Sequence, residues 1–507
     1  MSVAFRIVIC HMSVLSPGKV KEMNSRNGIT LLITILFCLI AIRPANAQSP
    51  ASTPSTADLQ ERIHQLETQM VEMRDEIDRL KRDNTTTADT KIVPISATLP
   101  ESTKPTQEAK QESKPAPKVT GIDLGPVRAV PFGTIYFNAF GNSGGTNNSD
   151  VPLFATPTNA GNVSMSVRQT RLGLKLEGPV IWNAKSRGLV EADFFGGFPV
   201  VGVGDNFGIV RVRLAFARLD WESTSLEAGQ DWMVFAPNNP VSIAAAAIPQ
   251  MASAGNPWSR LPQIRLEKRW DGGKFVWQGA VLAPSTGDSP AATGSTFFLQ
   301  PTTGAASRVP FFQSRVAFND ANWFGIKKSG SIGLSAQYGR ARVQNTPGNN
   351  MIESFGLAAD WNFPIVARLT INGEVFVGRN LSGFQAGVFQ GFNSDFAYRR
   401  GSALISGGPR AIGTRGGWTQ LGFTPPLLSD RLTIYGTYGL DDPRDGDLVS
   451  LSVRDWRLRN EAFAFSFLYK FSPQFSWGIE FRRFDTSYLR SGTQTANHVN
   501  LGAAYSF

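Results

Sequence analysis

The chain ends in His498-Val499-Asn500-Leu501-Gly502-Ala503-Ala504-Tyr505-Ser506-Phe507. Every second residue from Val499 to Phe507 is apolar, and the residues between them are small or polar. Successive side chains of a β-strand point to opposite faces. The alternation therefore predicts a strand with one apolar face and one small, polar face.

The aromatic ending of this strand carries further information. Tyr505 and the terminal Phe507 resemble the closing strand of outer-membrane β-barrels, where this pattern is the signal that the barrel assembly machinery recognises. The resemblance implies an assembly signal at these two residues. Such a strand must pair with an earlier one, because an open sheet edge leaves unpaired backbone groups in hydrocarbon. The alternative is the last strand of a soluble β-sandwich.

Composition agrees with a large β structure that alternates apolar and polar residues. The chain has 507 residues, of which 49 are Gly and 35 Phe, and only 18% are charged. A mean hydropathy of −0.13 is typical of a barrel, in which outward apolar and inward polar positions cancel. The net charge of +10 would suit nucleic-acid binding, but the arginines are scattered along alternating positions, so we expect no nucleic-acid partner.

Residues 1–47 have the features of an export signal peptide. An apolar run at 29–42 is followed by Ala45-Asn46-Ala47, which offers small residues to a signal peptidase. Residues 1–22 add nothing that a signal needs, so Met23 is an alternative start.

Residues 58–83 contain a short heptad seam. Its core positions are spaced alternately by four and three residues and are Leu59, Ile63, Leu66, Met70, Met73, Ile77 and Leu80. This spacing predicts a parallel coiled coil, and the heptads alone leave dimer and trimer open. We side with a homotrimer, because barrels of this kind usually trimerise.

Residues 84–120 are rich in Thr, Ser, Pro, Lys and Gln and predict an extended polar linker. The linker is either a plain spacer or a segment whose basic residues contact an anionic polymer of the cell wall. A structural role, in which coiled coil and linker tether an outer membrane to the wall, is the alternative function.

The segment 121–507 predicts an all-β transmembrane barrel of about 16 antiparallel strands, preceded by the short coiled-coil helix. Alternating segments occur at 132–141, 166–177, 185–195, 208–219, 225–234, 262–270, 274–283, 310–320, 329–343, 352–362, 366–379, 415–425, 430–440, 459–471, 474–487 and 496–507. Short turns at Gly178-Pro179, Asp271-Gly272-Gly273, Phe363-Pro364 and Ser472-Pro473 alternate with long connections. An even strand number returns both ends to the periplasm, where the coiled coil is expected.

The same alternation assigns a pore lining. Inward basic residues come from the second, fourth, sixth and eighth strands: Arg171, Lys175, Arg211, Arg213, Arg265, Arg269 and Arg315. Inward acids on neighbouring strands are Glu191, Asp193, Glu227, Asp231 and Glu267. Planar guanidinium groups suit carboxylate and phosphate oxygens, which favours passage of anions. The alternative is that these charges only brace a wet wall by pairing with each other.

The long connection 235–261, between the fifth and sixth strands, contains no carboxylate. In general sixteen-stranded porins the corresponding loop folds inward and narrows the pore. A constriction with arginine on the wall and no acid on the loop should favour anions.

The organisation of the chain resembles the DcaP-like porin family, which is akin to phosphate-selective porins. The local matches are Gly229-Gln230-Asp231-Trp232 and Leu261-Pro262-Gln263-Ile264-Arg265. The resemblance implies a homotrimer in the outer membrane that passes small anionic solutes such as dicarboxylates, with Arg265 as a lumen contact. Asp231 stands where the family more often has Thr or Ser.

Other functional classes fit the sequence poorly. The only histidines are His11, His64 and His498, and none accompanies a nucleophile, so we expect no enzyme activity. No metal-ligand spacing appears, and we expect no cofactor. An energy-coupled receptor would need a plug domain, for which 84–120 is too short and too polar. The expected partners are therefore outer-membrane lipid, further copies of the chain and the assembly machinery.

Overall fold

The computed structural model describes residues 121–196, 208–287, 301–343, 351–426 and 428–507. The predicted signal peptide, coiled coil and linker lie outside the described residues. Over these ranges the model contains no helix that combines the length and apolarity of a membrane span.

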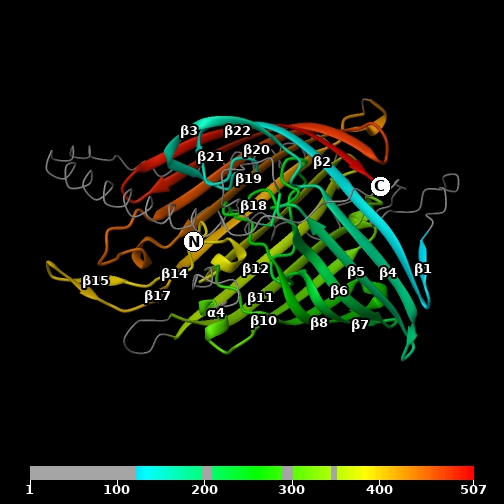
Figure 1. Ribbon diagram of the computed structural model, residues 1–507, viewed down its shortest axis with the longest axis horizontal. Coiled ribbons are helices and arrows are strands. Elements are labelled where there is room, and N and C mark those ends of the chain that lie inside the picture. The colour runs from blue at the N-terminus through cyan, green and yellow to red at the C-terminus, as the bar shows by residue number, and fades with distance from the viewer. Residues whose placement is uncertain (1–120, 197–207, 288–300, 344–350, 427) are drawn as a thin grey trace, which may run out of the picture. The chain divides into compact units, whose positions relative to one another are not determined.

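One antiparallel sheet makes up most of the described chain (Figure 1). Its strands are β1 (Ile122–Leu124), β2 (Val127–Thr146), β3 (Ala155–Ser166), β4 (Arg171–Ile181), β5 (Ala184–Asp193), β6 (Arg211–Asp220), β7 (Thr224–Trp232), β8 (Arg260–Trp270), β9 (Phe275–Leu282), β10 (Phe311–Asp320), β11 (Gly330–Arg342), β12 (Met351–Val366), β13 (Leu369–Arg379), β18 (Gly413–Phe423), β19 (Leu432–Pro443), β20 (Arg457–Lys470), β21 (Phe475–Tyr488) and β22 (Gly492–Ser506). Each strand from β4 to β22 pairs with its neighbour along the sheet, and β22 pairs with β2.

The sheet has 18 strands by label, but β1 only pairs with the start of β2, and β3 and β4 together form one crossing. If β1 is not counted and β3 and β4 are counted as one strand, the barrel has the sixteen predicted strands. The backbone closes the barrel at its ends, because Phe507 N–H donates to Gly133 O (3.0 Å) and Gly133 N–H donates to Phe507 O (3.1 Å). The prediction that the terminal strand pairs with an earlier one is confirmed.

Small elements occupy the connections. They are α4 (Thr303–Ala306), η4 (Asp271–Gly273), η5 (Trp323–Gly325), η6 (Ser382–Phe384), η7 (Leu428–Asp430), η8 (Asp445–Asp447), and the pairs β14 (Phe392–Asn393) with β17 (Arg410–Ala411) and β15 (Ala397–Arg400) with β16 (Ala403–Ser406). The β15–β16 hairpin projects at the end opposite β1 (Figure 1). Long connections therefore gather at one end of the barrel and short turns at the other.

Two predicted turns are wrong. Gly178-Pro179 lies within β4, where the register shifts between Glu177 and Val180, and the turn follows at Trp182 and Asn183, both with positive φ. Pro364 likewise lies within β12 at a register shift before Val366. Proline lacks an N–H donor and is tolerated in a sheet at such irregular positions, so it marked a bulge rather than a turn.

The predicted second strand, 166–177, is also longer and is interrupted. β3 and β4 leave residues 167–170 out of the ladder, and Thr170 Oγ1 accepts the hydrogen bond of the Tyr136 N–H instead (3.0 Å). Arg168 and Gln169 are buried there. Both make contacts inside the barrel that an unbroken strand would not allow.

The two faces of the sheet follow the predicted alternation. Val499 and Leu501 on β22 are about half exposed, whereas Asn500 between them is fully buried. On β21, Ile479 is exposed while Glu480 and Arg482 are buried. The apolar face therefore points out of the barrel, and the polar face points into it.

Candidate functional site

The connection between β7 and β8, residues 233–259, lies inside the barrel, and we call it the inner loop. Its backbone is hydrogen-bonded in turn to β10, β11, β13 and β18, and further on to Gln169 between β3 and β4. Because these strands lie around the barrel, the loop follows the inner wall. The connection therefore folds inward, which the sequence alone did not decide.

Three wall glutamines hold the backbone of the inner loop. Gln313 Oε1 accepts the Val234 and Phe235 N–H groups (2.8 and 3.0 Å). Gln420 accepts the Val241 N–H (2.9 Å) and donates to Val241 O (3.0 Å).

Gln169, which left the strand ladder, accepts two N–H groups, those of Ala246 (2.7 Å) and Ala247 (2.9 Å), and donates to Ala244 O (3.0 Å). The three amides thus hydrogen-bond to backbone groups of the inner loop: Gln169 and Gln420 both donate and accept, whereas Gln313 accepts.

Two fully buried glutamates add further acceptors. Glu374 on β13 accepts from the Asn238 N–H (3.1 Å) and from Trp418 Nε1 (3.1 Å). Glu480 on β21 accepts from Ser242 Oγ (2.7 Å). These two side chains fix the loop to parts of the wall that lie four strands apart along the sheet, at β13 and β21.

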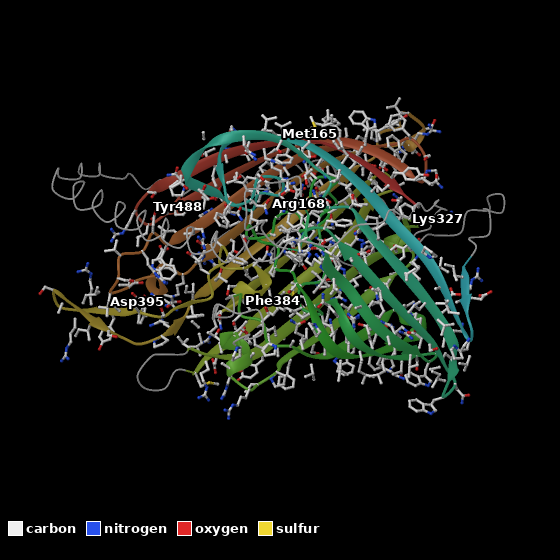
Figure 2. The ribbon with its side chains drawn as sticks, viewed as in Figure 1. Met165, Arg168, Lys327, Phe384, Asp395 and Tyr488 are labelled. Atoms are coloured by element: carbon white, nitrogen blue, oxygen red, sulfur yellow. The ribbon has the colours of Figure 1, made fainter. Side chains whose placement is uncertain are left out.

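A second connection also reaches the interior. Phe384 is fully buried, and its ring centroid lies 6.0 Å from that of Phe235 in the inner loop and 6.1 Å from that of Phe311 on β10. Its carbonyl accepts the Trp258 N–H (3.0 Å). Figure 2 labels Phe384 and Arg168 within the outline of the barrel, with Asp395 and Lys327 toward its two ends. The inner loop is therefore packed from two sides.

The predicted inward arginines of β6 form a compact charged group. Arg213 is buried and pairs with Glu191 (2.6 Å) and Asp193 (2.8 Å). Arg211 also pairs with Asp193 (2.6 Å) and donates to the carbonyl of Ala247 in the inner loop (3.0 Å). The wall charges and the inner loop thus meet at one place.

Three further predicted inward arginines also have carboxylate partners. Arg265 pairs with Glu227 (2.6 Å) and Asp231, Arg269 pairs with Glu267, and Arg315 pairs with Asp360 (2.6 Å). These contacts match the bracing role that the sequence left open.

The basic pair on β4 is placed differently. Arg171 donates to Tyr136 Oη (3.2 Å), and the Lys175 ammonium lies 5.1 Å from the centroid of the Phe132 ring. Both side chains are half-buried.

At the chain terminus, Tyr505 is outward and about one-third exposed.

Arg260, at the start of β8, is a basic residue that the sequence did not single out. Its guanidinium carbon lies 4.7 Å from the Trp232 ring centroid and 5.1 Å from that of Trp258, and Nη2 donates to Ala247 O (2.8 Å). Within the described ranges no carboxylate pairs with it, and Nη1 has no hydrogen-bond partner. Arg211 and Arg260 share the Ala247 carbonyl, so this end of the inner loop has one more cation than its ion pairs neutralise.

The bracing role predicts a large cost for breaking an inner pair. Arg315→Ala leaves Asp360, which is fully buried, without its partner, and we expect a loss of about 3–5 kcal/mol in the free energy of unfolding. Arg415→Ala is the matched control, because the Arg415 side chain is 77% exposed and its pair with Asp442 is worth about 0–1 kcal/mol. Urea unfolding followed by tryptophan fluorescence measures both. Equal losses would contradict a bracing role for Arg315.

The barrel is similar to solved outer-membrane structures. The outer membrane channel DcaP of Acinetobacter baumannii aligns with a TM-score of 0.56 and 17% identity, over 76% of this chain and 99% of that one. An anion-selective porin from Comamonas acidovorans aligns with a TM-score of 0.47 and 12% identity, over 75% of this chain and 100% of that one. No family model and no curated protein matches the chain. The DcaP alignment shows a shared barrel fold.

Proposed function

We propose that the protein is a DcaP-like porin of the Gram-negative outer membrane, through which small hydrophilic solutes diffuse passively, with a preference for anions such as dicarboxylates. One observation carries the proposal: a closed sixteen-stranded barrel whose inner loop lacks carboxylates and meets a wall that bears arginines. Barrels of sixteen strands are wide enough for an aqueous channel.

The charges around the inner loop support the preference for anions. The paired arginines Arg211 and Arg213 are balanced by Asp193 and Glu191, whereas Arg260 adds positive charge without a carboxylate partner in the described part. The proposed pore lining also includes the other inward basic residues, Arg171, Lys175, Arg265, Arg269 and Arg315. Passage requires weak binding at several places, so we expect no single tight site.

Assembly follows from the same proposal. The protein is a homotrimer in outer-membrane lipid, inserted by the barrel assembly machinery through Tyr505 and Phe507, with its coiled coil in the periplasm. Contact with the cell wall and the alternative tethering function depend on residues 58–120, outside the described ranges. No observation on the described barrel favours tethering over diffusion.

Planar-bilayer recordings test the proposal. Under a salt gradient we expect conductance in steps of three and a reversal potential that indicates anion preference. Arg265→Ala removes the ion-pair partner of Asp231 and leaves Glu227 with Arg218 alone (3.3 Å), so the reversal potential should move toward that of a cation-selective pore. Lys327→Gln, in the turn between β10 and β11, removes one charge away from the inner loop and should leave it unchanged. A purified, folded protein without conductance would refute diffusion.

A further inference from the structure

The outward face of seven neighbouring strands, β11 to β13 and β18 to β21, becomes charged toward the end with the long connections. Farther from that end, the same outward face carries apolar residues such as Leu334, Val377 and Phe463, which are all well exposed. Nearer the long connections the outward face carries a charged band that we call the outer belt. Its residues are Arg340, Arg342, Glu353, Arg379, Arg415, Asp442, Arg459, Glu461, Arg483 and Asp485. Register pairs such as Arg340 with Glu353 and Arg415 with Asp442 place members of the belt opposite each other on neighbouring strands.

The outer belt has six arginines and four acids. Four ion pairs use all the acids: Arg379 with Glu353 (3.5 Å), Arg415 with Asp442 (2.9 Å), Arg459 with Glu461, and Arg483 with Asp485 (2.9 Å). Arg340 and Arg342 are exposed and have no carboxylate partner in the described part. The belt therefore carries an excess of positive charge.

A cavity of about 920 Å³ opens within this belt. Arg379, Arg415 and the outward Val377 line it, together with Arg410 and Arg444 from the connections above. Arg410 pairs with Asp447 (2.7 Å), whereas Arg444 has no ion pair within the described ranges. Asp442, Asp445 and Asp447 also line the cavity, so its lining holds four arginines and three carboxylates beside Val377 of the exposed apolar face.

The outer belt ends at β22. Asn497 is the register partner of Arg483, and its N–H donates to Ser143 Oγ on β2 (2.9 Å). At the level of the belt these two strands are therefore polar but uncharged. The charge of the outer belt therefore does not continue onto β22 and β2. A general need for solubility would instead have spread charge evenly around the barrel.

We propose that the cavity between Arg379 and Arg415 binds a phosphate group of the glycolipid headgroups in the outer leaflet. The proposal rests on the proposed outer-membrane location. Arginine forks match phosphate oxygens, and the site lies where the apolar band ends and headgroups begin. A lipid phosphate is the occupant rather than a transported solute, because no residue that lines the cavity belongs to the inner loop and the cavity adjoins the outward Val377.

The test uses the full-length protein in detergent and lipid A carrying two phosphates as the probe. Arg379→Gln/Arg415→Gln should bind it about tenfold more weakly or worse, because two charge-assisted contacts are lost. Lys327→Gln/Lys328→Gln, which removes two charges at the turn between β10 and β11, should bind it like the original protein. Both arginines of the test pair are exposed, so the variant should fold normally.

Two further arms identify the ligand. Dephosphorylated lipid A should bind both proteins equally and weakly, and inorganic phosphate should not displace lipid A at equal concentration. Unchanged affinity of the variant, equal binding of dephosphorylated lipid A, or displacement by inorganic phosphate would each overturn the lipid-phosphate site. Conductance and ion preference of the variant should equal those of the original protein, so a failed pore and a failed lipid site are told apart.

Discussion

Replacing residues 237–257 by a short linker of Gly and Ser raises the single-channel conductance severalfold. The inner loop lies against the wall from β10 around to Gln169, and most of its residues are buried. A sixteen-stranded barrel without such a loop leaves an aqueous channel, and the narrowest section determines the resistance to ions. Single-channel recording in a planar bilayer measures the change.

The shortened protein should still fold, because the barrel is closed by backbone pairing between β2 and β22. Gln420, Glu374 and Glu480 lose their loop partners, but water that enters the widened interior can replace those hydrogen bonds. The matched control removes the β15–β16 hairpin, which lies outside the inner loop. That deletion should leave conductance unchanged, and an unchanged conductance after loop replacement would contradict a constriction by the inner loop.

The strand pattern was predictable because each strand encodes its own two faces. On β20, Phe463, Phe465 and Phe467 are exposed, and Ala464 and Ser466 between them are buried, as period-2 alternation requires. Closure is also predictable, since open edges are not tolerated in hydrocarbon. The strand number and order therefore follow from local patterns.

The fastening of the inner loop was not predictable from local patterns. Gln313 and Gln420 occupy inward positions that any water-facing polar residue could fill, and their partners are 78 or more residues away in sequence. The interruption at residues 167–170 has the same origin, because Gln169 leaves the ladder to bind a loop more than 70 residues later. Partners at such distance leave no periodic signal.

Arg260→Glu should convert the proposed anion preference into a cation preference. Arg260 lies where the inner loop joins β8, and no carboxylate in the described part neutralises it, unlike Arg213 or Arg265. A charge about 4 Å from a passing ion contributes about 1 kcal/mol in water, so reversal changes the barrier by about 2 kcal/mol. Anion permeability should fall roughly thirtyfold and cation permeability should rise by a similar factor, so their ratio should fall roughly 900-fold.

Reversal potentials of three proteins measure this effect. Arg260→Gln keeps a similar length, loses one charge, and should give an intermediate value. Arg187→Glu is the control, because Arg187 is exposed and already pairs with Asp220 (2.6 Å) near the turn between β4 and β5. If Arg260→Glu shifts the reversal potential no further than Arg187→Glu does, the positive charge at the inner loop does not set ion preference, and the paired arginines of the wall serve only to brace it.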